Sequence, residues 1–309
     1  MTKVLVVGSI NMDLVVETTH FPRLGETLFG QRFATHPGGK GANQAVAGAR
    51  LGAQVTMIGR VGNDAFGQQM TATLAAEGIN IGWVGVSPTA ATGIAAITVC
   101  DGDNAILVVP GANRELSPEH LAASEQAFVD ADIVLAQLEV PMVTIEAAAA
   151  LADKHGKSFI LNPAPSARLP IDLLGKVALL TPNEYELAVA LDGKPEDGRL
   201  LLAVLPGKVV MTKGRDGAYF TNATGAVQHQ PSYLVQAVDS TGAGDTFNGA
   251  IAAYWDLGLA AATREASMPT AAQTGASRSW LRRLGSGPCC RSGSCSMGLL
   301  LLQGTQPAG

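Results

Sequence analysis

The sequence lacks the features that mark several large classes of protein. It has no excess of positive charge, since 21 Lys and Arg residues stand against 26 Asp and Glu residues, for a net charge of −5. Binding to nucleic acid or to an anionic membrane surface needs a clustered basic excess, so we expect neither partner. The opening apolar run is interrupted by Asn11 and Asp13 before it reaches the length of a signal-peptide core or a membrane span. A cytoplasmic protein is therefore expected.

Cysteine and the common nucleotide-binding fingerprints are also scarce. The four cysteines, Cys100, Cys289, Cys290 and Cys295, show neither the paired spacing of a zinc site nor an even framework across the chain. The sequence has no G-x-x-x-x-G-K-[ST] motif, and no G-x-G-x-x-G follows an apolar run. Neither a P-loop nor a dinucleotide-binding Rossmann site is supported.

Apolar runs of strand length alternate with segments of helical period along most of the chain. Runs such as KVLVVGS, QVTMIGRVG and ADIVLAQLE are nearly continuous in apolar residues, which is typical of strands covered on both faces. Helices are predicted over 63–78, 141–156 and 182–193, each with Asn or Pro near its start and Gly at its end. The pattern predicts a doubly wound, mostly parallel α/β sheet with helices on both faces, in which ligands bind beyond the carboxyl ends of the strands.

Two segments depart from this alternation. Residues 13–35 and 92–113 carry alternating apolar and polar residues around Gly or Pro turns, which predicts two short antiparallel hairpins. Together they would form a small sheet over the mouth of the main one. The alternative is that they are edge strands of the main sheet.

The first of two glycine clusters is HPGGKGANQAVAGARLGA, residues 36–53, with Lys40 and Asn43 on the first turn of a predicted helix. Small residues allow close packing of that helix, and the glycines allow a ligand to approach the backbone. The alternative is a tight turn before a packed, alanine-rich helix.

The second cluster is VDSTGAGDTFNGA, residues 238–250, in which Asp245 follows Gly242, Ala243 and Gly244 at the start of a predicted helix. Free amides at a helix N-terminus attract an anion. They could hold the charge that develops on a transferred phosphoryl group while Asp245 takes the proton of an attacking hydroxyl. The alternative is that Asp245 is only the N-cap of the helix.

These clusters, taken with other short motifs, resemble the ribokinase family of carbohydrate kinases. The motifs occur in the family's order and cover residues 4 to about 260: GSINMD (8–13), PGGKGANQAVA (37–47), GRVGNDAFG (59–67), NPAP (162–165), TPNEYE (181–186), TKGRDGA (212–218) and the second glycine cluster. The resemblance implies a ribokinase-like fold with a β-sheet lid that closes over the sugar. It also implies ATP-dependent phosphorylation of the primary hydroxyl of ribose.

The resemblance further implies a role for individual residues. Asp245 would be the general base, and the amides of Gly242, Ala243 and Gly244 would form the anion hole. The sugar would be bound by Asn11, Asp13, Gly39, Lys40, Asn43 and Glu139. The nucleotide would be bound by Asn183, Thr212, Lys213, Gly214, Gly217, Gly242 and Gly244.

Two metal ions and a homodimer are implied in the same way. Glu186 would serve Mg²⁺, although a solvated first helical turn would explain this residue equally well. Asp239 and Thr241 would help to bind K⁺. The lid would pair with the lid of a second subunit.

The last 44 residues or so break with the rest of the chain. Residues 266–309 contain no Asp, Glu, Lys, Val or Ile, and they hold Cys289, Cys290 and Cys295. We expect a kinase domain over 1–265 and an aberrant tail over 266–309, produced by a shifted reading frame. A low-complexity extension or a lineage-specific cap are the alternatives.

If the tail is genuine, part of the adenine pocket and of the K⁺ site is missing. The chain could then be a catalytically impaired sugar-binding protein, and a kinase for another sugar or a nucleoside is a further alternative.

Overall fold

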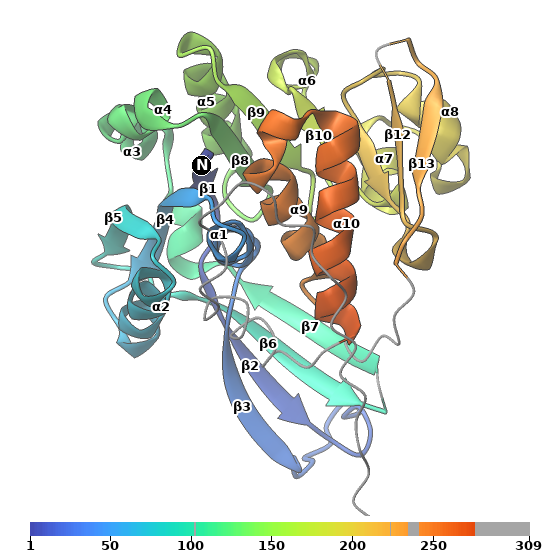
Figure 1. Ribbon diagram of the computed structural model, residues 1–309. Helices are drawn as coiled ribbons and strands as arrows, with labels where there is room; N and C mark the ends of the chain where they lie inside the picture. The colour runs from blue at the N-terminus through green and yellow to red at the C-terminus, as the bar shows by residue number, and fades with distance from the viewer. Residues whose placement is uncertain (102, 223, 234–240, 276–309) are drawn as a thin grey trace, which may run out of the picture.

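A six-stranded parallel sheet forms the centre of the protein (Figure 1). The structure is a computed structural model that describes residues 1–101, 103–222, 224–233 and 241–275. The strand order is β10-β9-β8-β1-β4-β5, and the neighbouring strands all run parallel. The strands are β1 (Lys3–Val7), β4 (Gln54–Gly62), β5 (Asn80–Ser87), β8 (Ile133–Gln137), β9 (Ser158–Asn162) and β10 (Leu179–Leu180). The predicted parallel sheet is confirmed.

Helices cover both faces of this sheet, because alternate strand residues point to opposite sides. Val4 and Val6 pack in one core with α1 (Lys40–Arg50), α2 (Ala65–Ala76), α9 (Ala243–Ala253) and α10 (Leu259–Gly275). Leu5 and Val7 pack in the other core, with α3 (Pro118–Ala123), α4 (Glu125–Asp130), α5 (Met142–Lys154), α6 (Ile171–Lys176), α7 (Glu184–Ala190) and α8 (Gly198–Leu202). The helices predicted over 63–78, 141–156 and 182–193 are α2, α5 and α7. Within the described residues, no helix is long and apolar enough to cross a membrane.

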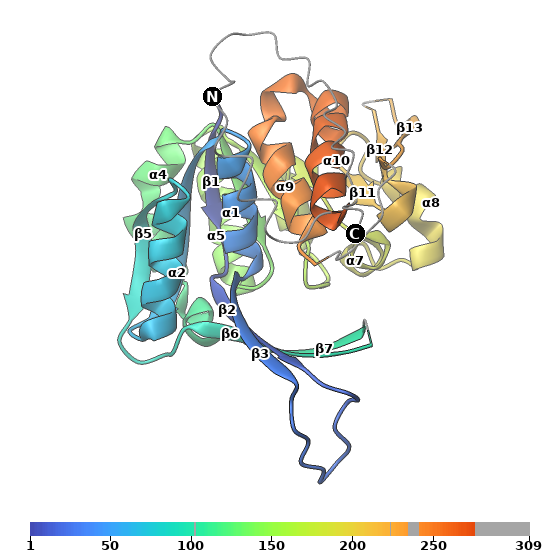
Figure 2. The same ribbon diagram turned by 60° about the horizontal axis from the view of Figure 1, so that its bottom comes forward.

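The two predicted hairpins form a separate sheet that extends from one end of the main one (Figure 2). β2 (Asn11–Glu17) pairs antiparallel with β3 (Arg32–Gly38), and β6 (Gly93–Cys100) pairs antiparallel with β7 (Asp103–Val109). Parallel pairing of β2 with β6 joins the two hairpins into the order β3-β2-β6-β7. We call this four-stranded sheet the lid. The hairpin prediction is confirmed, and the edge-strand alternative is wrong.

A third sheet was not predicted. β11 (Val210–Thr212), β12 (Ala218–Thr221) and β13 (Val227–Gln230) form an antiparallel meander. An isolated parallel bridge from Leu180 to Val209 connects it to β10. The apolar run at residues 208–214, KVVMTKG, therefore bridges to the parallel sheet at Val209 and does not form another of its strands. It turns back after three strand residues through Gly214 and Gly217, whose φ angles of 48° and 91° favour glycine.

Helix α10 carries the chain past residue 265, where we expected the domain to end, as far as Gly275. Residues 276–309 lie outside the described part of the chain. The origin of the tail therefore stays a prediction.

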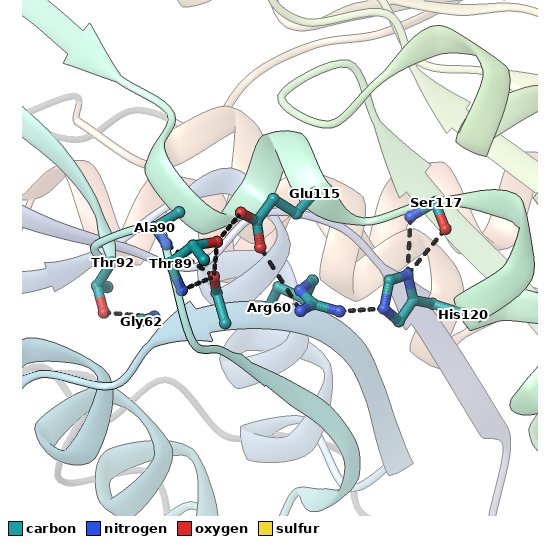
Figure 3. A network of polar contacts seen from close by, with 9 residues as sticks. Arg60, Gly62, Thr89, Ala90, Thr92, Glu115, Ser117 and His120 are labelled. Atoms are coloured by element: carbon teal, nitrogen blue, oxygen red, sulfur yellow. Dashed lines mark hydrogen bonds and ion pairs between the residues drawn. The ribbon is translucent and has the colours of Figure 1, made fainter.

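The β6–β7 hairpin of the lid is anchored at both of its ends, and Figure 3 shows its contacts with Arg60 and Gly62 of β4. Thr92, just before β6, accepts a hydrogen bond from the amide of Gly62 (2.9 Å). Its own amide and hydroxyl donate to the carboxylate of Asp64, each at 2.7 Å. Asp64 is also the N-cap of α2 and accepts from the amide of Gly67 at 2.8 Å. One carboxylate thus ties the first lid root to the body.

The second root follows β7, where η1 (Gly111–Glu115) ends at an ion pair (Figure 3). The carboxylate of Glu115 lies 3.5 Å from Arg60 Nη2 and accepts from the hydroxyl of Thr89 at 3.0 Å. Arg60 also contacts the ring of His120, at the start of the next helix. Strand β4, through Gly62 and Arg60, therefore holds both ends of the β6–β7 hairpin.

We predict that Asp64→Ala lowers the free energy of unfolding by about 1–3 kcal/mol, because a helix cap and the Thr92 contact are lost together. Burial raises the pKa of Asp64, but hydrogen bonds from Thr92 and from the amides of Gly67 and Phe66 outweigh it and hold that pKa below its usual value. The stabilisation is therefore complete above the unfolded pKa of about 4 and is lost as the pH falls through the lower folded pKa. Urea unfolding at several pH values measures this. The exposed Asp153 on α5 provides a control, and an Asp64→Ala loss equal to that of Asp153→Ala would contradict the prediction.

Candidate active site

The predicted site residues gather at the carboxyl edge of the main sheet, from which the lid also rises. Ser9 follows β1, Glu139 follows β8, Asn162 ends β9 and Thr181 follows β10. The end of β10 lies close to the first turn of α7, which begins four residues later. Strand ends, helix starts and the lid root therefore meet at one place, as expected for a parallel α/β sheet.

Asp245 lies in the first turn of α9 and is 8% exposed. The N-cap of α9 is Gly242, with φ 75°, so Asp245 is not the cap and that alternative is wrong. Instead its Oδ2 accepts from Asn43 Nδ2 and its Oδ1 accepts from Gln44 Nε2, both at 3.0 Å. The carboxylate is thus held by α1, while the amides of the first turn of α9 have no acceptor within their own helix.

The charges around Asp245 oppose one another. Burial raises the pKa of Asp245, the positive charge of Lys40 and the hydrogen bonds from Asn43 and Gln44 lower it, and the charge of Glu139 raises it again. The net effect is a raised pKa. A carboxylate with a raised pKa is a stronger base than an ordinary aspartate.

Glu139 is fixed by groups from the first glycine cluster and from the end of β1. Its Oε2 accepts from the hydroxyl of Ser9 (2.5 Å) and from the amide of Lys40 (3.0 Å). Gly39, which precedes Lys40, has a φ angle of 88°, and a Cβ on it would lie 2.7 Å from the amide nitrogen of Asn11. Lys40, Glu139 and the start of β2 are therefore in close contact, and this glycine is required for it.

Asn11 and Asp13 occupy space that neighbouring glycines leave open. In the lid, Asn11 pairs with Gly38 on β3 and with Gly93 on β6. A Cβ on Gly38 would lie 2.2 Å from Asp13 Oδ1, and a Cβ on Gly93 would lie 2.2 Å from Asn11 Oδ1. These two polar side chains therefore need glycine on the adjacent strands.

Asn113 orients Asn11. Its Nδ2 donates to Asn11 Oδ1 at 2.7 Å, and its Oδ1 accepts from the amide of Ile10 at 2.9 Å. The oxygen of the Asn11 amide is thus satisfied by the protein. The nitrogen of the same amide remains as the donor that Asn11 can offer to a hydroxyl.

Asn183 and Glu186 form a capping box at the start of α7. The amide of Glu186 donates to Asn183 Oδ1 at 2.9 Å, and the amide of Asn183 donates to Glu186 Oε2 at 2.8 Å. Burial raises the pKa of Glu186 and Asp245 raises it further, while the Asn183 amide and Lys40 lower it, with a net rise. Glu186 is therefore within electrostatic range of both Lys40 and Asp245.

The oxygens of Glu186 suit a Mg²⁺ ion that takes most of its ligands from phosphates and water. Among the described residues, no three His, Cys, Asp or Glu side chains gather into a metal-binding group. A site with one carboxylate ligand fits this arrangement. For K⁺, Asp239 lies outside the described residues, and Thr241 is exposed just before Gly242. The K⁺ site therefore stays a prediction.

Thr212, the last residue of β11, and Lys213 after it both lie beside the start of α7. Thr212 bridges to Asn183, and its amide donates to the carbonyl of Pro182 at 2.9 Å. Lys213 Nζ lies 3.3 Å from Glu184 Oε1, in a cavity of about 380 Å³ that Tyr219 also lines. None of the predicted sugar-binding residues lines that cavity. The structure therefore brings the Thr212 backbone to the N-cap of α7 and the Lys213 side chain to Glu184 in its first turn, and Gly214 and Gly217 form the turn beyond.

The buried side-chain amides near Asp245 were not predicted from the sequence. Gln44, Gln137, Asn162 and Asn248 are all buried, and they connect α1, β8, β9 and α9. Gln137 and Asn162 could have been found, because each ends a strand that otherwise reads as apolar. Gln44 stands in an alanine-rich helix, where the sequence does not show which face is buried.

The chain matches known proteins along most of its length. The model of the pfkB family carbohydrate kinases matches residues 1–277. A ribokinase of Bacillus subtilis (strain 168) is 40% identical over 253 residues, which are 82% of this chain and 85% of that protein. A deoxyribokinase of Salmonella typhimurium is 37% identical over 262 residues, 82% of this chain and 85% of its own. The structure of Arabidopsis thaliana ribokinase complexed with ribose and ATP is 30% identical with a TM-score of 0.83, covering 93% of this chain and 100% of that one.

We predict that Gly249→Ala destabilises the fold and separates α9 from α1. A Cβ on Gly249 would lie 2.5 Å from the carbonyl oxygen of Gln44 and 2.7 Å from Ala47 Cβ. Overpacking of this kind costs about 1–3 kcal/mol in the free energy of unfolding, which chemical denaturation measures. Gly175→Ala on α6 is the control, because a Cβ there meets nothing within 4 Å. Equal stability of the two variants would show that the helices are not in the contact described.

Proposed function

This chain belongs to the pfkB family of carbohydrate kinases, and from that premise we propose that it transfers the terminal phosphoryl group of ATP to the primary hydroxyl of ribose. The observation that carries the proposal is the buried Asp245 carboxylate at the start of α9, held by α1 and within electrostatic range of Lys40 and Glu139. Family membership makes the chain a phosphotransferase with an alcohol group as acceptor.

Asp245 acts as the general base. It takes the proton of the ribose hydroxyl while the hydroxyl oxygen forms its bond to the terminal phosphorus of ATP, and the bond from that phosphorus to the ADP oxygen breaks. The amides of Gly242, Ala243 and Gly244 stabilise the negative charge on the transferred group. The carboxylate and the amides belong to one helix turn, so their relative position is fixed before the substrates bind.

The sugar is held by the polar groups at the lid root and on α1. Asn11 and Lys40 supply donors, Asp13 and Glu139 supply acceptors, and the backbone at Gly39 closes the site beside them. A mixture of donors and acceptors suits a polyol, whose hydroxyls do both. Asn43 can contact the sugar in addition to its hydrogen bond to Asp245, because that bond places its side chain beside the carboxylate that receives the proton.

The nucleotide occupies the neighbouring edge, between the start of α7 and the turn after β11. Asn183, Thr212 and the turn of Gly214 and Gly217 would line it, and Glu186 would hold Mg²⁺ partly through water. Bound Mg²⁺ neutralises phosphate charge. Asp239 and Thr241 are proposed to hold K⁺ near the anion hole. A cytoplasmic location fits a reaction that consumes ATP.

We predict that Asp245→Asn lowers kcat about 100-fold or more while most of the affinity for ribose is kept, since the base is removed and the amides remain. A coupled assay of ADP release measures kcat, and calorimetry measures ribose binding. Asp153→Asn, an exposed carboxylate on α5, is the matched control. A rate unchanged in Asp245→Asn would exclude Asp245 as the base.

The same assay separates the alternative functions. Ribose binding by the wild-type chain without turnover above the Asp245→Asn background would indicate a catalytically impaired sugar-binding protein. Faster turnover of 2-deoxyribose, the kind of substrate that the name of the Salmonella relative indicates, or of adenosine would assign a different acceptor.

The outer strand of the lid also supports a homodimer. All residues of β7 are exposed, and Leu107 has 74% of its surface exposed. An apolar edge strand with one unpaired side is an interaction surface or an aggregation hazard. Pairing with the lid of a second subunit would cover that side.

We predict that Leu107→Lys shifts the protein from dimer to monomer in sedimentation velocity, because a charge would be buried in the interface. Leu200→Lys, on α8 and away from the lid, changes a leucine that is 71% exposed and serves as the control. A wild-type chain that is monomeric at all concentrations would exclude the homodimer.

A further inference from the structure

Three buried side-chain amides and the Asp245 carboxylate are joined in one chain of hydrogen bonds. Gln137 Nε2 donates to Gln44 Oε1 at 2.6 Å. Gln44 Nε2 donates both to Asp245 Oδ1 (3.0 Å) and to Asn162 Oδ1 (3.1 Å). Asn162 Nδ2 donates in turn to the backbone carbonyl of Thr181 at 3.0 Å. The chain runs from β8 through α1 to β9 and the end of β10, and it includes a single ionisable group, Asp245.

The direction of every hydrogen bond in this chain is fixed by its far end. The carbonyl of Thr181 can only accept, so Asn162 must present its nitrogen there and its oxygen to Gln44. Gln44 must therefore present its nitrogen to Asn162 and to Asp245, and its oxygen to Gln137. A backbone carbonyl on one edge of the sheet thus ensures that Asp245 faces a donor.

Gln44 has no polar group left for a substrate. Its nitrogen serves two acceptors, its oxygen accepts from Gln137, and its side chain is fully buried. Asn43, the residue before Gln44, donates a side-chain hydrogen bond to Asp245 and is only partly buried. The two neighbours on α1 therefore differ, since Asn43 can reach the sugar and Gln44 can act only through Asp245.

We propose that Gln44 is a positioning residue, which holds Asp245 ionised and in one orientation so that Oδ2 is directed at the hydroxyl to be phosphorylated. The proposal rests on the proposed function of Asp245 as general base. A carboxylate with a donor on each oxygen cannot rotate about its terminal bond without losing both contacts. Without Gln44, rotation would cost only the Asn43 contact instead of two contacts.

The other charged groups that face Asp245 are Lys40 on α1, Glu139 after β8 and Glu186 on α7. None of them is changed by a substitution at Gln44. A shift of the Asp245 titration in a Gln44 variant would therefore report the lost hydrogen bond. Removing a donor from an ionised carboxylate favours its protonated form and raises its pKa.

The test is Gln44→Met in the full chain, because methionine keeps the length of the side chain and removes the donor. We expect kcat for ribose to fall about 10-fold or more, with the Kd for ribose by calorimetry changed less than about 3-fold. We also expect the acid limb of the kcat/KM profile against pH to move upward by about one unit. A role in packing alone would lower stability and would leave that limb in place.

Two further variants make the result specific. Gln126→Met removes an amide that donates to Asp130 at 2.9 Å on the exposed surface of α4, and it should match the wild type in rate and profile. Gln137→Met leaves Gln44 in place but frees its oxygen, so we expect a smaller shift in the same direction. If Gln44→Met does not fold, the profile of Gln137→Met decides, and an unshifted acid limb there overturns the proposal.

The proposal and the function on which it rests fail in different ways. Wild-type kcat and an unshifted profile in Gln44→Met, with Asp245→Asn inactive, would overturn the role of Gln44 alone. Full activity of Asp245→Asn would overturn the proposed base, whatever Gln44→Met does.

Discussion

The site depends on the burial of one carboxylate against two amide donors. An isolated ionised carboxylate in a protein interior costs several kcal/mol, and Asp245 offsets that cost with hydrogen bonds from Asn43 and Gln44 and with the charge of Lys40. The compensation is incomplete, because the pKa of Asp245 remains raised. In the proposed mechanism, this residual cost of burial is what makes Asp245 accept a proton readily.

The pairing of α1 with α9 makes this compensation possible. Both donors to Asp245 come from α1, and Gly249 lets α9 approach the same stretch of α1 at backbone distance. The amides that are proposed to bind the anion lie at the start of α9, between about one and two turns before that contact. Asp245, its two donors and the amides of the first turn of α9 therefore belong to one packed unit on a single face of the main sheet.

The sequence was sufficient to predict the parallel sheet, both lid hairpins and the edge of the sheet at which the chemistry takes place. These features depend on local periodicity and on glycine positions, which a single sequence displays. It did not predict the meander of β11 to β13, because Gly214 and Gly217 turn a strand that reads like the others. It also missed Gln44 and Asn113, whose roles depend on partners about a hundred or more residues away.

The lid and the base approach the sugar from separate parts of the fold, which raises the question of how closure keeps them aligned. Asn113 bonds to Ile10 and Asn11, so the first residue of β2 is pinned to the body. Asp13 lies two residues further along the strand, on the same face as Asn11. Both proposed sugar contacts therefore lie within the anchored root, beside the start of β6, which Thr92 and Asp64 tie to the body. In the proposed mechanism, a lid that bends beyond Asp13 would therefore close over the sugar while these contacts keep their positions relative to Asp245.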